Sequence, residues 1–351
     1  MQALSTLHPS HARADIQPLA DRLHVLTMLE NPLRWRARYR NYWMFERHVE
    51  QSGAILYTCE IAFGEREFEL TRAGNPRHLQ LRASSELWRK ENALNLLAAR
   101  LPADAKYLAW IDADVQFGRP DWAQETLHLL QHYDVIQMFS HVQNIGPRYE
   151  PLTSRGSFLW NYVENRSAPH CSDFARPRPA SAGSGCYYYG GSGGGGKWNH
   201  TGFAWACRKS AFDHLGGLID WAIIGSADYH MAAALVGNVG ISLNPYFPPR
   251  YRQLCEQWEQ RAVRYVLRNP SGGVGYMPGT ILHHFHGSTV NRAYGKRWKL
   301  LGRTGFDPDL DLKRDWQGLW QLTDRNPELR DGLRAYARLR DEDSPDTRGM
   351  I

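Results

Sequence analysis

The fold is indicated by one stretch of sequence, Tyr107-Leu108-Ala109-Trp110-Ile111-Asp112-Ala113-Asp114-Val115. Its apolar first half is the length of one buried strand, and two carboxylates follow at once. Ligands of open α/β sheets bind at the carboxyl ends of strands. Side chains two positions apart in extended backbone point to the same side, so Asp112 and Asp114 are predicted to converge. Two such oxygen donors suit Mg²⁺ or Mn²⁺ that bridges to substrate phosphates. The alternative is a strand end whose aspartates only cap the next helix.

Hydrophobic patterning around this stretch predicts alternating strands and helices. Strands are expected at 23–29, 54–63, 78–82, 107–111, 135–139, 202–208 and 274–282, and helices at 38–51, 84–100, 121–132, 210–215, 231–236 and 251–268. The alternation predicts an α/β fold with a mostly parallel sheet flanked by helices.

The chain is expected to contain one catalytic domain with a segment at either end. Residues 1–20 are predicted to be a loose arm, 21–300 the domain, and 301–351 a helical C-terminal extension, helical and polar over 307–343. A Gly-rich stretch at about 179–197 interrupts the domain. It is either a flexible insertion or a lid that orders over a ligand.

Composition restricts the functional classes. The 351 residues carry a net charge of +6, which is compatible with phosphate-bearing ligands but is too small an excess to indicate nucleic-acid binding by itself. Five scattered cysteines without a Cys-x-x-Cys pair argue against a zinc site or a disulfide framework. No run of about 18 apolar residues occurs. We therefore expect a protein of the reducing cytoplasm without a membrane anchor.

Polar residues follow the first two predicted strands. Thr27, Asn31, Arg34 and Arg36 lie at or beyond the end of the first strand and are candidates to contact a nucleotide. Glu60, late in the second strand, is a candidate acceptor of hydrogen bonds from a ribose or base. The alternatives are a solvated, arginine-rich helix start and a solvent-facing carboxylate.

Two later stretches also contain reactive side chains. Asp228 lies where a loop becomes a helix, so it is either an N-cap or a catalytic base. The run His283-His284-Phe285-His286 is followed by cations, including Arg292 and Lys296. In an extended strand His284 and His286 share a face, which suits a metal beside a pyrophosphate. Packed, hydrogen-bonded histidines before a solvated basic helix are the alternative.

Aromatic side chains give a further set of candidates. Trp198, Trp205 and Trp221 are candidates to stack on a sugar or base, with a role in the core as the alternative. His230, two residues after Asp228, is a fourth candidate for substrate binding.

These motifs together resemble nucleotide-sugar-dependent glycosyltransferases of the GT-A class (Rossmann-like), in the broad group related to family two. The resemblance is carried by Ile111-Asp112-Ala113-Asp114, by residues 202–212 with Leu215-Gly216-Gly217, and by the Asp228 loop. It implies that Asp112 and Asp114 bind a divalent metal on the donor diphosphate, with His286 or His284 as a third ligand. It also implies that Asp228 is the base of an inverting reaction. Ala227 replaces the glutamate usual at that position, and stereochemistry stays open.

The resemblance implies a metal-dependent hexosyl- or pentosyltransferase that uses Mn²⁺ or Mg²⁺ and a nucleotide-sugar, with a UDP-sugar as the favoured donor. Candidate acceptors are a hydroxyl of a hydroxymethylated pyrimidine in phage DNA or of a glycan. The chain is also similar to uncharacterised bacteriophage glycosyltransferase-like proteins, which implies the bacterial host cytoplasm. The alternatives are a non-catalytic sugar- or nucleic-acid-binding module, which Ala227 favours, and a nucleotidyltransferase. The latter needs a Gly-rich phosphate loop that the first strand lacks.

Overall fold

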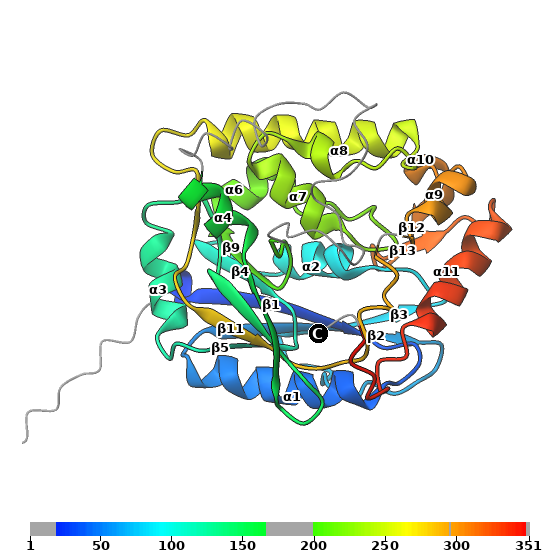
Figure 1. Cartoon of the computed structure of the whole chain (residues 1–351), viewed down its shortest axis with the longest axis horizontal. Coiled ribbons are helices and arrows are strands. Elements are labelled where there is room, and N and C mark those ends of the chain that lie inside the picture. The colour runs from blue at the N-terminus through cyan, green and yellow to red at the C-terminus, as the bar shows by residue number, and fades with distance from the viewer. Residues whose placement is uncertain (1–18, 166–198, 295, 349–351) are drawn as a thin grey trace, which may run out of the picture.

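The computed structural model describes residues 19–165, 199–294 and 296–348 (Figure 1). The predicted N-terminal arm up to residue 18, the Gly-rich stretch and Trp198 lie outside the described residues.

A seven-stranded sheet forms the centre of the molecule. Its strands lie in the order β10 (Val274–Tyr276), β6 (Val135–Gln137), β9 (Ala204–Arg208), β4 (Tyr107–Ile111), β1 (Leu23–Glu30), β2 (Ile55–Phe63) and β3 (His78–Ala83). β9 is antiparallel to both of its neighbours, and the other adjacent pairs are parallel. The predicted class is confirmed: the protein has a mixed α/β fold with a central, largely parallel sheet flanked by helices.

Helices cover both faces of this sheet (Figure 1). One face packs against α1 (Arg36–Gln51) and α3 (Trp122–Leu129). The other packs against α2 (Lys90–Ala98), α6 (Lys209–Leu215), α7 (Ala227–Leu235) and α8 (Pro249–Ala262). Side chains of β1 point alternately to the two faces of the sheet. Leu23 and Val25 pack on the face that α1 and α3 cover, and Leu26 packs on the opposite face. Helix α4 (Phe158–Asn165) packs near β6 and β10, and a short π-helix, Val263–Leu267, continues α8.

A second sheet brings distant residues to the end of β4. Its strands lie in the order β5 (Val115–Phe117), β11 (Thr280–His283), β7 (His141–Ile145) and β8 (Pro151–Gly156). β11 is antiparallel to β5, with His283 opposite Val115. The His284 backbone N–H donates to the Asp114 carbonyl oxygen at 2.8 Å. This pairing places the histidine run beside the aspartate turn.

Three predicted segments differ from the structure. Residues 84–88 are not helical, because the Trp88 backbone N–H donates to the Ile223 carbonyl and the Arg89 side chain pairs with Glu30, so α2 begins only at Lys90. The predicted strand at 274–282 is two strands, β10 and β11, which belong to different sheets.

The predicted helical extension also contains strands. It has α9 (Lys299–Arg303), α10 (Pro308–Asp311) and α11 (Pro327–Leu339), but β12 (Leu312–Arg314) and β13 (Trp320–Leu322) form a hairpin between α10 and α11. None of the described helices is both long and apolar enough to cross a membrane.

Candidate active site

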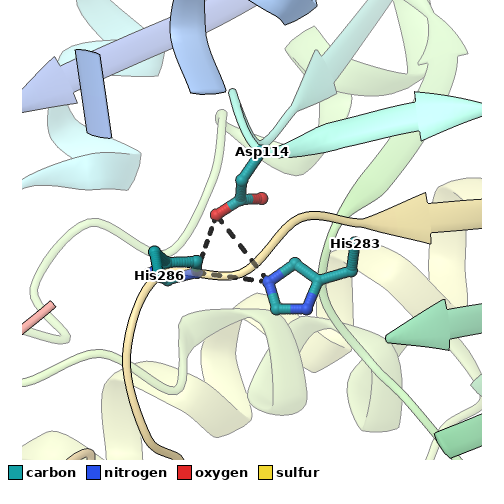
Figure 2. Close-up of side chains that lie close together, drawn as sticks. All are labelled: Asp114, His283 and His286. Atoms are coloured by element: carbon teal, nitrogen blue, oxygen red, sulfur yellow. Dashed lines mark hydrogen bonds and ion pairs between the residues drawn. The ribbon is translucent and has the colours of Figure 1, made fainter. Parts of the chain in front are cut away.

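Three side chains meet beyond the end of β4: Asp114, His283 and His286 (Figure 2). Asp114 Oδ2 lies 2.9 Å from His286 Nε2 and 3.8 Å from His283 Nε2, and the two Nε2 atoms are 3.2 Å apart. Potential ligand atoms from all three lie within 4.8 Å of one another. Two imidazoles and one carboxylate fit Mn²⁺ or a later transition metal better than Mg²⁺, which prefers oxygen ligands.

Neighbouring residues orient both imidazoles toward this point. His283 Nδ1 is 2.8 Å from Asn144 Oδ1, and His286 Nδ1 is 3.2 Å from Glu342 Oε2. Both oxygens accept, so each neutral ring carries its proton on Nδ1 and has an unprotonated Nε2; at His286 this nitrogen also lies 3.1 Å from Arg292 Nη2. Two facing lone pairs repel each other unless a cation or a proton lies between them. A ligating histidine whose other nitrogen donates to an oxygen is the usual arrangement at metal sites.

The Asp114 carboxylate also fits a metal ligand. Its Oδ1 is buried and has no hydrogen-bond partner in the described part of the chain, which is costly unless a cation satisfies it. Burial acts to raise the pKa of Asp114, but the positive charge that His286 and His283 carry when they are protonated outweighs burial and holds this pKa below the ordinary value. The Arg292 guanidinium, whose Nη2 donates to His286 Nε2 at 3.1 Å, adds further positive charge.

Asp112 does not join this group, contrary to the prediction. The backbone leaves the strand after Ile111 and turns at residues 113 and 114, so the same-side rule for extended backbone does not apply. The Asp112 carboxylate instead forms an ion pair with Lys90 at the start of α2. The structure therefore separates the two aspartates into one that holds Lys90 and one that faces the histidines.

His284 is also separated from the cluster. Its Nε2 lies 3.2 Å from Gln116 Oε1, and its ring faces Tyr149. β11 ends at His283, and the chain turns immediately afterwards, so side chains three apart converge rather than side chains two apart. His283 therefore replaces His284 in the ligand set that the geometry supports.

Asp228 lies in the first turn of α7, as the sequence indicates. Thr201 Oγ1 donates to Asp228 Oδ2 at 3.2 Å. Gly202 passes close by, since a Cβ atom there would lie 2.8 Å from Oδ2. The helix is preceded by Ser226 at φ 83°, a conformation that costs a non-glycine residue energy and that clusters at functional sites.

A cavity of about 220 Å³ joins these groups. Asp112, Asp114, Asp228, His283 and His286 all line it, so the cluster and the candidate base share one space. Five cations also line it: Arg38, Lys90, Arg292, Arg297 and Arg340. Such a concave space with convergent charged groups is the expected form of an active site.

The residues predicted to contact a nucleotide have structural partners. Thr27 Oγ1 donates to the Ile111 carbonyl at 2.8 Å, and Asn31 binds both backbone polar groups of Trp35. The Glu60 carboxylate accepts from the backbone N–H groups of residues 69, 70 and 71. Asn31 and Glu60 line a separate pocket with Arg34, whereas the Arg36 side chain is exposed.

The aromatic candidates occupy the core rather than the cavity. Trp205 is buried, stacks on Trp110 and donates from Nε1 to the Thr201 carbonyl, which is the core role that the sequence left as the alternative. His230 is fully buried against Tyr251, and its Nδ1 lies 2.8 Å from Ser242 Oγ. Neither residue lines the cavity that contains Asp114 and Asp228.

Two further predicted residues lie away from the cavity. Trp221 packs against the core on the side of the sheet that α2, α6, α7 and α8 cover, and Lys296 is exposed. Neither side chain lines the cavity.

Several residues that the sequence did not single out line the same cavity. They are Lys90, Glu91, His200, Tyr294, Tyr336, Arg340 and Glu342. Lys90 and Glu91 are the first two residues of α2, the helix that follows β3 in the chain. The only local sequence signal for their place in the cavity was a charged pair at the start of a helix. Tyr336, Arg340 and Glu342 come from α11 and the residues after it, which no motif connects to the aspartates.

The buried carboxyl group of Glu91 should make the free energy of unfolding depend on pH. Its side chain is buried, and burial, opposed by Lys90 and reinforced by Asp228, raises its pKa to about 7. Because the pKa of Glu91 is higher in the folded state than the unfolded-state value of 4.5, its contribution to stability is fully present at pH values below 4.5. This contribution is lost as the pH rises to about 7. We expect Glu91→Gln to be more stable than the wild type at pH 8 by at most about 3 kcal/mol.

The measurement is urea unfolding of both proteins from pH 4 to pH 8. The difference between them should vanish near pH 4. A difference that is constant across this range would show that Glu91 does not titrate there.

The contacts of Glu342 predict a link between the C-terminal segment and the candidate metal site. It is 1% exposed, accepts from Arg38 and Arg340, and holds His286 Nδ1. Loss of such an outer partner lowers metal affinity by about 10- to 100-fold. Glu342→Gln should weaken Mn²⁺ binding by that factor in calorimetric titration.

The exposed Glu328→Gln is the matched control for this variant. Because Glu342 also pairs with buried arginines, the titration belongs well below the melting temperature of the variant. A folded Glu342→Gln protein with wild-type Mn²⁺ affinity would disprove the link.

Comparison with known proteins gives weak similarities. No protein-family model matches the sequence, and no curated protein matches it. The catalytic domain of Drosophila β1,4-galactosyltransferase 7, solved with xylobiose, is 11% identical at a TM-score of 0.35, over 88% of this chain and 98% of that chain. A putative nucleotide-diphospho-sugar transferase from Desulfovibrio desulfuricans G20 is 11% identical at 0.30, over 74% and 80%.

A third similar structure is S. aureus TarS 1–349, at 7% identity and a TM-score of 0.35, over 61% of this chain and 55% of that chain. A mutant of the Drosophila enzyme was solved with manganese, UDP-Gal and xylobiose. These TM-scores are all below 0.5, so the function has to be argued from the site itself.

Proposed function

We propose that this protein is a metal-dependent glycosyltransferase that moves a sugar from a nucleotide-diphosphate sugar to an acceptor hydroxyl. The observation that carries the proposal is the convergence of Asp114, His283 and His286 on one point, in the same cavity as Asp228. A metal site and a separate carboxylate in one cavity are the two elements that such a transfer needs.

The metal would be held by Asp114 Oδ2 and the Nε2 atoms of His283 and His286. When bound, it supplies a Lewis acid that neutralises charge on a leaving diphosphate. The two nitrogen ligands favour Mn²⁺ over Mg²⁺. Arg292, next to His286, adds charge-assisted hydrogen bonds to a phosphate oxygen.

Asp228 would take the proton from the acceptor hydroxyl. Thr201 orients its Oδ2, and the missing side chain of Gly202 leaves the approach to that oxygen open. Ala227 is buried in the core, so the position where a second carboxylate was expected does not contribute to the chemistry. One base suffices for an inverting transfer.

We further propose a UDP-sugar as the donor and a glycan hydroxyl as the acceptor. Trp35, Trp88 and Tyr294 in the cavity wall are the kind of side chains on which sugar rings pack. A hydroxymethylated pyrimidine in duplex DNA would have to leave its stack to reach Asp228, at a cost of a few kcal/mol. The cavity therefore favours the glycan.

The test is a thermal-shift screen of nucleoside diphosphates and nucleotide-sugars with Mn²⁺, with Mg²⁺ and with EDTA. A ligand of the folded state raises the melting temperature by mass action, and we expect one nucleotide-sugar to do so only with metal. Metal-dependent hydrolysis of that donor would then identify an enzyme. Binding without hydrolysis or transfer would favour the non-catalytic module, and release of pyrophosphate from a nucleoside triphosphate would favour a nucleotidyltransferase.

A further inference from the structure

Two of the five cations that line the cavity have no carboxylate partner among the described residues. Arg38 and Arg340 pair with Glu342, and Lys90 pairs with Asp112. Arg292 and Arg297, by contrast, are only 6% and 8% exposed and bind neutral groups. Asp228 acts on Arg297, and Glu342 on Arg292, only from beyond ion-pair distance. A buried guanidinium without a paired carboxylate is costly, so each of the two arginines can take a further anion.

The Arg297 guanidinium has unused hydrogen-bonding capacity. Nη1 donates to the Tyr336 hydroxyl at 3.0 Å and Nη2 donates to Ser226 Oγ at 2.6 Å, while Nε is buried and has no partner among the described residues. The Tyr294 ring lies 4.8 Å from the guanidinium carbon. Among the described residues only two of the five N–H groups are used, so the guanidinium, which lines the cavity, keeps capacity for a further acceptor.

The two arginines contact different parts of the site. Arg292 contacts His286 and therefore belongs to the corner where the metal and the diphosphate are proposed. Arg297 contacts Ser226, two residues before Asp228, and a Cβ atom on Gly225 would lie 3.2 Å from its Nη1. Arg297 therefore lies beside the turn that positions the candidate base, where an acceptor binds.

We infer that Arg297 binds an oxyanion on the acceptor, a carboxylate or a phosphate, so that the substrate class is an acidic sugar. This inference rests on the proposed function, because it divides the cavity into a donor side and an acceptor side. Guanidinium binds both oxyanions through paired N–H groups. The Tyr336 hydroxyl holds Arg297 in place, because it accepts from Nη1 and donates to the Arg292 carbonyl oxygen at 3.1 Å.

The binding test uses matched sugars that differ by one anionic group: methyl β-glucoside, methyl β-glucuronide and glucose 6-phosphate. Each is titrated calorimetrically into the full chain, with and without Mn²⁺ and UDP. A charged hydrogen bond at a buried site should favour the two acidic sugars over the glucoside by about 10- to 100-fold in affinity. The two acidic ligands distinguish a carboxylate from a phosphate preference.

Arg297→Gln should abolish this preference, and Arg297→Lys, which keeps the charge, should retain part of it. The control is Arg303→Gln, because Arg303 is exposed and pairs with Glu328 on the surface. Loss of the contact with Ser226 could also weaken the fold, but that would lower the affinity for neutral and acidic sugars together. The preference ratio therefore separates recognition from a structural role.

Each outcome decides the inference. A wild-type protein that binds the glucoside as well as the acidic sugars, or an Arg297→Gln protein that keeps the preference, overturns it. So does an Arg297→Gln protein that loses UDP affinity but keeps the preference for acidic sugars, since the anion would then be the donor diphosphate. If no nucleotide binds at all, the glycosyltransferase proposal fails, while the titrations without UDP still test the acidic-sugar site.

Discussion

Replacing Asp228 with asparagine is expected to lower sugar transfer by about 10²- to 10⁴-fold, the contribution usual for a positioned general base. Asparagine keeps the shape of the side chain and can still accept from Thr201, but it cannot take a proton. Asp228 is not part of the cluster of Asp114, His283 and His286. Affinity for Mn²⁺ and for the donor should therefore stay within a few-fold of the wild type.

The measurement is transfer from the donor found in the thermal-shift screen, with donor and Mn²⁺ affinities titrated in parallel. Asp213→Asn is the control, since Asp213 is an exposed aspartate of α6 whose ion pair with Lys209 is at the surface. Full activity of Asp228→Asn would refute the assignment of the base. Glu91 would then be the next candidate, because this buried carboxylate lines the same cavity and forms no ion pair with a described residue.

Replacing Asp114 with asparagine should remove metal-dependent activity. The variant lacks the only negative charge of the ligand cluster. Its effect on Mn²⁺ affinity should therefore exceed the about 10- to 100-fold typical of an outer partner such as Glu342. Donor binding should fall with it, because the proposed metal joins the donor diphosphate to the protein.

Asp112→Asn is the informative comparison for this variant. If both aspartates bound the metal, as the sequence predicts, the two variants would lose Mn²⁺ affinity alike. The structure pairs Asp112 with Lys90 instead, so Asp112→Asn should keep an affinity nearer to the wild type. Calorimetric titration of both variants with Mn²⁺ decides between these arrangements, and equal losses would restore Asp112 as a ligand.

The fold was largely predictable because it depends on local patterns. Apolar runs such as 107–111 and 54–63 form strands within one or two residues of the predicted bounds. The errors arise where tertiary contacts replace local preference. Ser84 and Ser85, at the start of the helix predicted over 84–100, instead donate to Gln321 of the β12–β13 hairpin, more than 230 residues away in the chain.

The site was predictable in composition but not in detail. The sequence indicated an aspartate, histidines and Asp228, but the choice of His283 over His284 depends on where β11 ends. Arg297 and Glu342 depend on partners 71 and 56 residues away in the chain, Ser226 and His286. The spacing of residues in the sequence does not predict such contacts, because they depend on how α11 and the segment after it pack against the cavity.

That C-terminal segment has a consequence for biosynthesis. Asp343 accepts from the backbone N–H groups of Arg36 and Ala37 at the start of α1, and its neighbour Glu342 orients His286. A nascent chain on the ribosome carries Asp114 and both histidines before residues 340–343 have emerged. Full metal affinity would therefore be acquired only after these residues dock, which would keep an incompletely folded chain from retaining the ion.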